Sequence, residues 1–532
     1  MIWYRLFVAV ALVGMCCCAC AGRSHTAGLQ GPLALPEERL ERRPVDDAIE
    51  AARRDALAHE IARAVSPAEA PSAAPGAAAH AASVDKKAPD PDCKLSLAEI
   101  VSRALLANRR LLDAKDSVET ARLSVVAAEA QFELKIMPLA SAGVYGASGS
   151  NTSSTIGSGV KLEKRLPQGT VASVTPSVYR TGGDYTSSVG FSVTQPLLRG
   201  LSAEYNLSGV HGAQFASRTA QRMLFLSRVD TVLSTVVAVY EIVRQRETLR
   251  LCEESAARLK GHAEAARAKE GIGLAGPIDT YRATIQLKQA EDALTQAREA
   301  LRDAQDNLRL ILALPLDKKM EVEAPLSYTP VRVSEDEAVR TALANRVELD
   351  QAADTVREAE RNSRVAKHGM LPELNLVLDY TRTGQDANFG QSAKLDSDAW
   401  GMSLSGTTDL WRTAERAAYA QSMVALQAAY RSQELRRDEV ALQVKRELGA
   451  LRRSEQRIAI QQEQIRQAEG QMELARVKFQ RGLANNFDVI EAETELRRAQ
   501  TSLVSAVVDY IAGSFRFRAA LGTLIQKPGV GE

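Results

Sequence analysis

Apolar residues near the end of the chain recur every three or four positions on both sides of a short polar interruption at 482–486. That spacing places them on one face of an α-helix, so it predicts two helices joined by a turn. Asn485 or Asn486 would cap the second helix, and Asp488 would lie in its first turn, where the helix dipole favours an acid. The apolar positions are Ile465, Ala468, Met472, Ala475 and Phe479, then Phe487, Ile490, Leu496, Ala499, Leu503, Val507 and Tyr510.

The same turn occurs earlier in the chain. Residues 266–279 read ARAKEGIGLAGPID and residues 475–488 read ARVKFQRGLANNFD. The offset from 266 to 475 and from 279 to 488 is 209 in both cases. Ungapped similarity at a constant offset predicts an internal repeat.

Two regions change to an alternating pattern rich in Gly, Ser, Thr and Val, which is typical of strands and hairpins. The first, at about 139–195, contains about four strand-like runs, and the second, at about 373–409, contains two. The runs are about ten residues long, the length that a tilted strand needs to cross a bilayer. Trp400 and Trp411 flank the last run, where they would lie in a membrane interface belt or pack within the protein.

The remaining pattern is helical. Ser96 and Glu99 form a capping-box sequence that opens a helix to about 136, ended by Pro138, and Ser334 opens the equivalent helix before Pro372. Very long helices follow at about 203–269 and 413–480, each roughly 100 Å long. Shorter helices run at about 278–313 and from the second tip to about 521. Helix, strands, long helix, tip and shorter helix therefore occur twice.

The first 94 residues differ from the rest. Residues 1–20 have a basic residue, an apolar core and a cysteine-rich end, which resembles a bacterial lipoprotein signal peptide. Acylation is expected at Cys20, with Cys16, Cys17 and Cys18 as alternatives, and an ordinary cleaved signal is the other interpretation. Residues 21–94 are rich in Ala, Pro and charge, which predicts a disordered tether.

Composition excludes several classes of function. The chain has 532 residues and a formal net charge of +1, which argues against a nucleic-acid partner. Histidines are scattered, and no catalytic motif, phosphate-binding loop or metal-ligand spacing occurs, so neither an enzyme nor a cofactor is expected. Aromatic residues are only 5%, which suits long helices packed through small side chains.

Membrane strands in such small groups cannot close a barrel alone, whereas several identical chains could each donate strands to one barrel. Helices of this length would pack side by side as a hollow cylinder. A barrel continued by such a cylinder is a conduit.

The motifs, their order and the duplication resemble the TolC family of outer-membrane efflux channels, including its lipoprotein branch. The resemblance covers about 95–522. The residues that carry it are Gly482, Asp488, Val489, Ala492, Leu496, Ala499, Leu503, Asp509 and Tyr510, with 519–522 at the last helix end and 195–198 at the strand-to-helix joint.

This resemblance implies a mostly α fold with a small membrane β-region. Long antiparallel helical hairpins would form a periplasmic α-barrel above a trimeric transmembrane β-barrel of twelve strands. The first repeat would span 95–330 with its tip at 270–279, the second 331–522 with its tip at 479–488, and 523–532 would be a tail. The surplus of strands in the first repeat departs from the family, and a hairpin near 156–179 would extend the barrel or lie outside its wall.

The implied function is a passive exit duct of a tripartite efflux or type I secretion system. Its partners would be two further copies of the chain, a periplasmic membrane-fusion adaptor protein, an inner-membrane transporter and outer-membrane lipid. The chain would be lipid-anchored in the bacterial outer membrane, with its helical part in the periplasm. The alternative is a structural or adhesive coiled-coil surface protein without channel activity.

In the family the two tips contact the adaptor, which assigns docking to Ile272, Gly273 and Leu274 and to Arg481, Gly482 and Leu483. The glycines could instead serve only the turn backbone. Asp488 and Glu491 match acids that line the closed end of the family's tunnel, where three chains would bring about six carboxylates together and favour cations; Asp279 is the corresponding acid of the first tip. Dipole compensation and a solvated helix face are the other interpretations. Ala484 and Phe479 replace the family's tip-locking arginine and tyrosine.

Overall fold

A computed structural model describes residues 94–145, 153–273, 276–317, 320–481, 483–484 and 486–527. The expected signal peptide, its cysteines and nearly all of the expected tether lie outside these residues. The chain forms two compact units. One contains the strands, in 123–214 and 358–426, and the other is helical, in 94–122, 215–357 and 427–527.

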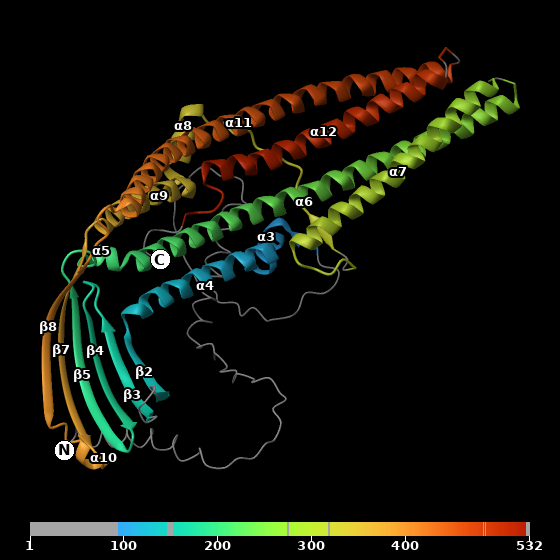
Figure 1. The fold of residues 1–532 in the computed structure, drawn as a ribbon. Helices are drawn as coiled ribbons and strands as arrows, with labels where there is room; N and C mark the ends of the chain where they lie inside the picture. The colour runs from blue at the N-terminus through green and yellow to red at the C-terminus, as the bar shows by residue number, and fades with distance from the viewer. Residues whose placement is uncertain are drawn as a thin grey trace, which may run out of the picture. The chain divides into compact units, whose positions relative to one another are not determined.

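The first half of the chain runs from short helices through four strands to a long helical hairpin (Figure 1). Its short elements are β1 (Lys94–Ser96), α3 (Leu97–Ala107), α4 (Arg109–Glu129) and a 3-10 turn (Ala130–Phe132). Its strands are β2 (Leu134–Tyr145), β3 (Ser153–Arg165), β4 (Val171–Thr181) and β5 (Asp184–Pro196). Then follow α5 (Ala203–Asn206), α6 (Ser208–Gly271), α7 (Pro277–Ile311) and β6 (Glu321–Glu323).

The second half repeats this order with two strands instead of four. It consists of α8 (Glu335–Asn345), α9 (Val347–Gly369), β7 (Glu373–Asp386), α10 (Phe389–Ser392), β8 (Ser397–Thr407), α11 (Thr413–Gln480) and α12 (Asn486–Leu521). The predicted plan of a mostly helical chain with long hairpins and antiparallel strands is therefore confirmed.

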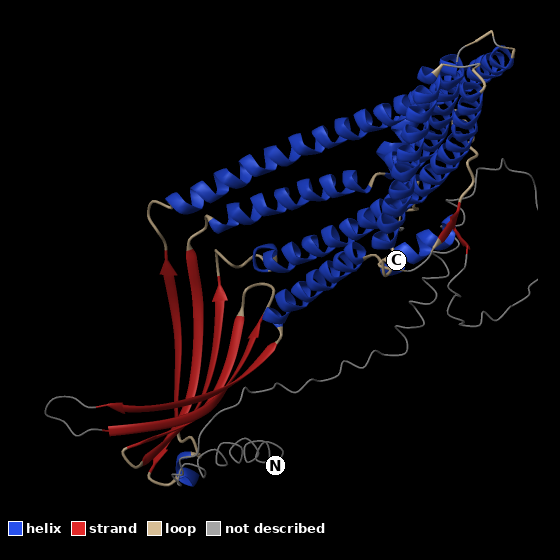
Figure 2. Ribbon diagram, turned by 90° about the vertical axis from the view of Figure 1, so that its right-hand side faces the viewer, coloured by secondary structure: helices blue, strands red, loops and turns tan. Residues whose placement is uncertain are grey.

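All six long strands form one antiparallel sheet in the order β2-β3-β4-β5-β7-β8 (Figure 2). The β5–β7 pair joins the two halves of the chain, because Tyr185 lies opposite Asp386 and Pro196 opposite Asn375. In the helical unit, β1 and β6 form a separate two-stranded parallel sheet that the sequence pattern did not predict.

The core of the helical unit consists of two apolar clusters. The first combines α3, α6, the end of α7 and α12, with Ile100, Val236 and Leu308 fully buried. The second combines α8, α11 and α12, with Ala338, Ala342, Leu448 and Phe517 among its buried residues. Since α12 contributes to both clusters, the last helix is the element that the two halves share. Alanines at these contacts let the helix axes approach closely, as the composition predicted.

The helix starts follow from local sequence. Ser96 and Glu99 form a complete capping box, and the Ser334 hydroxyl accepts a hydrogen bond from the Glu337 amide. Both predicted caps are thus confirmed. Each of these first helices is interrupted, however, after 107 and after 345, so that two helices stand where the pattern predicted one.

Both interruptions lie in the repeated sequence Ala-Asn-Arg. At each one, a side chain donates hydrogen bonds to the C-terminal end of another helix. Asn108 Nδ2 donates to the Ile311 carbonyl at the end of α7 (3.0 Å). In the second half, Arg346 Nη1 donates to the carbonyls of Ala519 and Ala520 at the end of α12 (3.3 and 3.4 Å). These bonds satisfy carbonyls that a helix end leaves without an intrahelical partner.

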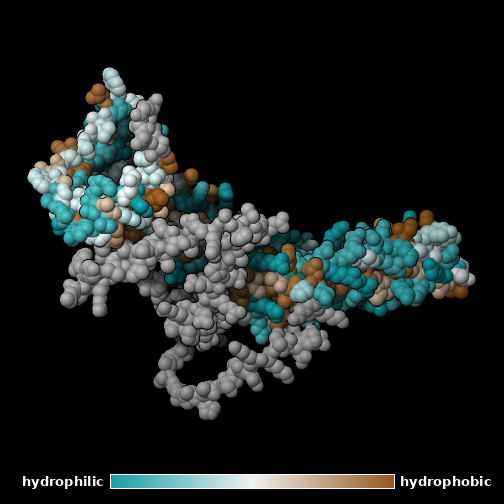
Figure 3. All heavy atoms as spheres, turned by 60° about the horizontal axis from the view of Figure 1, so that its bottom comes forward, coloured by the Kyte–Doolittle hydropathy of each residue, from teal (hydrophilic) through white to brown (hydrophobic). Residues whose placement is uncertain are grey.

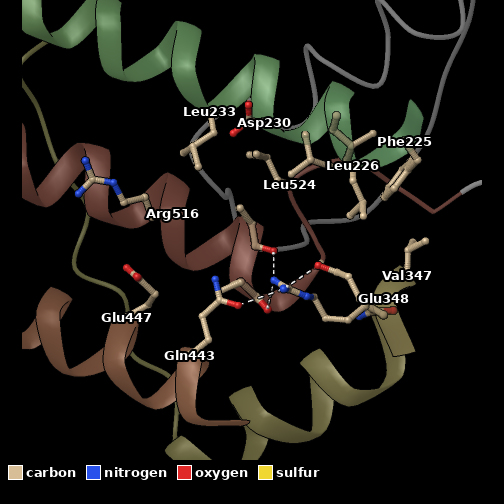
Figure 4. A pocket seen from close by; sticks show the side chains of 17 residues that line it. Phe225, Leu226, Asp230, Leu233, Val347, Glu348, Gln443, Glu447, Arg516 and Leu524 are labelled. Atoms are coloured by element: carbon tan, nitrogen blue, oxygen red, sulfur yellow. Dashed lines mark hydrogen bonds and ion pairs between the residues drawn. The ribbon is translucent and has the colours of Figure 1, made fainter. Parts of the chain in front are cut away.

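A cavity of about 320 Å³ lies beside this second helix end. Figure 4 shows Glu348 and Gln443 converging on one guanidinium group there. The Arg346 guanidinium is 2.7 Å from Glu348 Oε1 and 3.0 Å from Gln443 Oε1. Its Nη groups are thus occupied by protein partners, whereas its buried Nε has none among the described residues.

Two predicted boundaries are wrong. The first helical segment ends at Glu129 rather than at Pro138, and the first strand begins at Leu134 rather than near 139. Pro138 lies within β2, the edge strand of the sheet within one chain, where its missing N–H costs at most one ladder hydrogen bond. The expected tail also packs in part, because Leu524 is buried in the first core cluster.

Within the described residues, α6 is the one helix that is long and apolar enough to cross a membrane by composition. Val232, Val236 and Val239 of this helix are buried in the first core cluster. Its apolar stretch therefore belongs to the protein core.

Candidate functional site

The ends of the two long hairpins, α6–α7 and α11–α12, contain most of the predicted functional residues. The first tip is formed where α6 ends at Gly271 and α7 begins at Pro277, a first helical position where proline is tolerated because its missing N–H would have no intrahelical partner. Gly273 has φ 74°, a left-handed conformation that favours glycine, and its amide donates to the Glu270 carbonyl (2.9 Å). In the second tip, Leu483 N donates to the Lys478 carbonyl (2.8 Å). Leu274, Gly482 and Asn485 lie outside the described residues.

Both tips expose large apolar side chains. Ile272 is 71% exposed and Leu483 is 74% exposed, and Arg481 is exposed beside Leu483. Ile278, Tyr281 and Phe487 follow in the first turns of the outgoing helices and are also more than half exposed. In Figure 3 the helical surface is mostly hydrophilic, and hydrophobic atoms are visible along it and at its far end. Exposed apolar groups concentrated at one place are typical of a surface that binds another protein.

Small residues hold the helices together behind the tips. Ala263, Ala266 and Ala283 of the first hairpin pack with Ile490 of α12. Ala475, Val489 and Ala492 form the matching cluster of the second hairpin. Ile490 thus connects the two hairpins through apolar contact.

An ion pair with one buried partner also joins the two hairpins. Arg258 Nε on α6 lies 2.8 Å from Glu493 Oε1 on α12, and the Glu493 side chain is only 2% exposed. Its second oxygen, Oε2, is buried without a hydrogen-bond partner among the described residues. A carboxylate in this position depends strongly on Arg258, because an uncompensated charge in the interior is costly.

Three further contacts cross between the hairpins. The His262 ring lies edge-on to the Phe479 ring, with centroids 5.1 Å apart, and Lys269 Nζ lies 3.6 Å from the Phe479 centroid. Asn486 Nδ2 donates to the main-chain carbonyl of Asp279 (3.1 Å). We call the pairs Arg258–Glu493, His262–Phe479 and Asn486–Asp279 the inter-hairpin contacts.

The environment of His262 disfavours its protonated form. Burial lowers the pKa of the imidazole below its ordinary value, and the positive charge of Lys269 lowers it further, while the negative charge of Glu493 acts in the opposite direction. The neutral ring is therefore the form that suits the packed hairpins.

The predicted acids occupy different environments. Asp488 and Glu491 are exposed in the first turns of α12, whereas Asp279 is half-buried and contributes its main-chain carbonyl to the inter-hairpin contacts. The structure thus brings Asp279 to the second hairpin, whereas Asp488 and Glu491 are exposed in the single chain. Exposed carboxylates at a helix start can both complement the helix dipole and face a shared channel.

Sequence reasoning missed Arg258, His262 and Glu493. Glu493 occupies the same apolar stripe as Ile490 and Leu496, three positions from each. An acid within an apolar stripe is a signal of a buried, paired charge, and it could have identified this site. Phe479, an apolar position of the helix before the turn and the replacement for a tyrosine, packs against His262, and Ala484 is half-buried.

The described residues contain no group of three or more His, Cys, Asp or Glu side chains that could hold a metal ion. Cys252 is a free, buried thiol. Trp400 is 79% exposed and Trp411 is 78% exposed, so packing within the chain does not explain either ring.

Comparison with known proteins identifies similar channels. The family described as outer membrane efflux protein matches residues 338–523. The outer membrane protein TolC of Vibrio cholerae is 24% identical over 335 residues, which cover 59% of this chain and 73% of that protein. The outer membrane efflux protein BepC of Brucella suis is 24% identical over 353 residues, covering 65% and 73%.

Solved structures extend the likeness. The outer membrane protein VceC from Vibrio cholerae superposes with a TM-score of 0.64 at 16% identity, over 80% of this chain and 96% of that one. At this level of identity the likeness concerns the fold alone.

Proposed function

Because this chain belongs to the TolC family of outer-membrane efflux channels of bacteria, we propose that it is the exit duct of a tripartite efflux or type I secretion system. It is a channel and not an enzyme, so an inner-membrane transporter supplies the energy. Three copies form the duct, and a periplasmic adaptor protein connects it to that transporter. The observation that carries this proposal is the pair of hairpin tips with Ile272 and Leu483 exposed at their ends.

The tips are the docking surface for the adaptor. Two apolar side chains, one on each hairpin, suit the apolar stripe of a partner's helical hairpin. Arg481 beside Leu483 adds a polar contact that fixes orientation. The similar sequences of the two tips let the adaptor bind both in the same way.

Asp488, Glu491 and Asp279 form the acidic end of the tunnel. Three chains bring these side chains around one axis, where a ring of carboxylates favours cations over anions. Exposure of Asp488 and Glu491 on α12 supports this role, since a channel-lining charge must remain hydrated.

The inter-hairpin contacts keep the tips closed. Each contact joins an element of the first hairpin to an element of the second, so separating the hairpins breaks all three. They replace the tip-locking arginine and tyrosine of the family, which Ala484 and Phe479 do not supply. All three contacts lie within one chain. Each chain of the trimer therefore resists the separation of its own two hairpins.

A lipid on the mature N-terminus anchors the chain to the outer membrane. Cys20 follows the small residue Ala19 at the end of the signal peptide and is the preferred acceptor, ahead of Cys16, Cys17 and Cys18. The tether 21–94 then connects the anchor to the folded part.

Conductance of the purified protein in planar bilayers tests the channel. We expect single-channel steps from a heat-labile trimer, with cation preference. A surface protein of the coiled-coil or adhesive kind would give neither steps nor a trimer of this kind, and that result would reject the proposal.

A further inference from the structure

The β3–β4 hairpin exists in the first half of the chain only, and it lies in the middle of the six-stranded sheet. We propose that every protomer contributes all six strands to the membrane wall. The trimer then closes an eighteen-stranded barrel, in which β8 of one copy pairs with β2 of the next. This inference rests on the trimer of the proposed function, and it concerns the strands that form the membrane wall of that trimer.

Spacing along the chain identifies β3–β4 as an insertion. The Ala-Asn-Arg sequence at 107–109 recurs at 344–346, an offset of 237, whereas the tips recur at an offset of 209. Between these landmarks the first half is therefore 28 residues longer than the second. The segment from the start of β3 at Ser153 to the end of β4 at Thr181 has nearly that length.

The inserted hairpin is fully integrated into the sheet. Strand β3 pairs with β2 from Leu134↔Lys164 to Tyr145↔Ser153. Strand β4 pairs with β5 from Val171↔Thr194 to Thr181↔Asp184. A hairpin folded outside the wall would leave β2 and β5 without these partners.

The turns at both ends of β4 are also part of the sheet structure. Gly182 and Gly183, both with positive φ, form the two-residue turn between β4 and β5. At the other end, a Cβ on Gly169 would lie 2.2 Å from the Gly200 carbonyl oxygen, so this turn is packed directly against the chain that follows β5. Thr170 Oγ1 donates to Gln195 Oε1 (2.5 Å) in the same place.

Side-chain alternation is continuous across all six strands. Because paired residues point to the same side of a sheet, the registers assign every strand residue to one of two faces. One face is mainly apolar: Ile136, Pro138, Ala140, Ala142, Val144, Ile156, Val160, Leu162, Ala172, Val174, Pro176, Val178, Val189, Phe191, Val193, Leu374, Leu376, Leu378, Tyr380, Trp400, Met402 and Leu404.

The opposite face of the inserted hairpin is polar, with Thr155, Lys161, Glu163, Ser173 and Thr175 among its side chains. The neighbouring strands β5 and β7 show the same division. An apolar outer face and a polar inner face are what a water-filled membrane barrel requires. The inserted strands meet this requirement as the other four do.

The two edges of the sheet fit each other. Successive strands are antiparallel, so the first and last of six, β2 and β8, run in opposite directions. All of β8 is exposed, as are Ile136 and Val144 of β2. Neither edge can remain unpaired in hydrocarbon, and six strands are too few to close on themselves. The occupant of each edge is therefore the complementary edge of another copy of this chain.

Strand number sets the width of the wall. With strands about 4.8 Å apart and tilted by about 40°, eighteen strands give a backbone diameter of about 36 Å, against about 24 Å for twelve. An insertion of two strands also preserves the alternating direction of neighbouring strands, because removing β3 and β4 leaves β2 antiparallel to β5.

The faces are tested with single cysteines in the full-length protein, in a background where Cys93 and Cys252 are serine. Environment-sensitive probes are placed at Val174→Cys and Thr175→Cys in reconstituted channels. We expect quenching by spin-labelled lipid at 174 and by aqueous iodide at 175. Leu378→Cys and Asp379→Cys on β7 are the matched controls. If both β4 positions respond to iodide alone while the β7 pair alternates, the hairpin lies outside the wall and the inference is wrong.

The strand number is tested by electron microscopy of the trimer in nanodiscs. We expect eighteen strands, and twelve in a variant lacking 153–181; twelve in the unaltered protein would overturn the inference. Native mass spectrometry counts the protomers separately. If each chain contributes six strands to the wall of an assembly that is not a trimer, the proposed trimer and its eighteen strands are rejected. The contribution of six strands per chain is then retained.

Discussion

Single residues decide how firmly the tips are held. Arg258→Ala would leave Glu493 buried without its cation, which is expected to weaken the inter-hairpin contacts by about 2 kcal/mol. The measured results are a lower melting temperature of the trimer and a higher open probability in bilayers. Arg258→Ala combined with Glu493→Gln should recover part of the loss.

Arg298→Ala is the matched control for this pair. Arg298 contacts Glu253 at 3.4 Å, and both side chains are more than half exposed. An exposed pair contributes less than about 1 kcal/mol. Equal effects of the two arginine substitutions would contradict the role assigned to Glu493.

His262 predicts a pH dependence of the closed tip. Its pKa in the packed hairpins is lowered by burial, so the released state takes up a proton more readily than the packed state. The free energy that favours the closed tip should therefore fall as the pH drops through about 6.5. Above that value, His262 should not affect it. Open probability measured between pH 7.5 and 5 should rise in the original chain and stay flat in His262→Gln. The control His211→Gln should keep the rise, and a rise that survives His262→Gln would assign it to other groups.

The tip acids predict ion selectivity. Asp488→Asn with Glu491→Gln should reduce the preference for cations, because the proposed ring loses its charge. Reversal potentials in a salt gradient measure this preference. Glu299→Gln, on the exposed side of α7, should leave the potential unchanged. An unchanged potential in the double variant would leave dipole compensation as the role of Asp488.

At the scale of elements, the hairpin tips should behave as a docking surface. Replacing Ile272 and Leu483 with serine removes two exposed apolar groups, each contributing about 1.5 kcal/mol or more once buried by a partner. Binding of the periplasmic adaptor should weaken by tenfold or more in a pull-down titration. Leu474→Ser, an equally apolar exposed site on α11, should bind normally. Full binding by the tip variant would show that the adaptor contacts the duct elsewhere.

Element type was predictable from the sequence because long periodic segments and caps are local signals. The Ser96 capping box, the Ser334 cap and the six strands all follow from short stretches of sequence. The boundary at Pro138 was not predictable, since proline ends a helix in one context and is tolerated on an edge strand in another. Only the pairing with β3 decides between them.

The candidate site was predictable only in part. Tip glycines and exposed Ile272 and Leu483 come from the repeated sequence, which is local information. The Arg258–Glu493 pair joins residues 235 positions apart, and no local pattern indicates which cation compensates Glu493. The parallel β1–β6 pair was missed for the same reason, because two three-residue strands have no periodicity to detect.

At the scale of the whole molecule, the proposed N-terminal lipid anchor has a direct test, although its cysteines lie outside the described residues. Metabolic labelling with palmitate should mark the original chain and Cys16→Ser, whereas Cys20→Ser should lose the label. Membrane fractionation then measures whether a chain without the lipid is released from the membrane. Label lost in Cys16→Ser and kept in Cys20→Ser would move the acceptor to Cys16, and no label in any chain would favour an ordinary cleaved signal.

The position of α12 has a consequence for how the protein is made. The first core cluster combines Ile100 and Leu111, near the start of the ordered chain, with Val508, Phe515 and Leu524 at its end. Ribosomes and secretion machinery release these segments in order, so neither core is complete until the last helix has emerged. A chain that ends before α12 therefore lacks residues of both core clusters, and it is expected to be much less stable than the full chain.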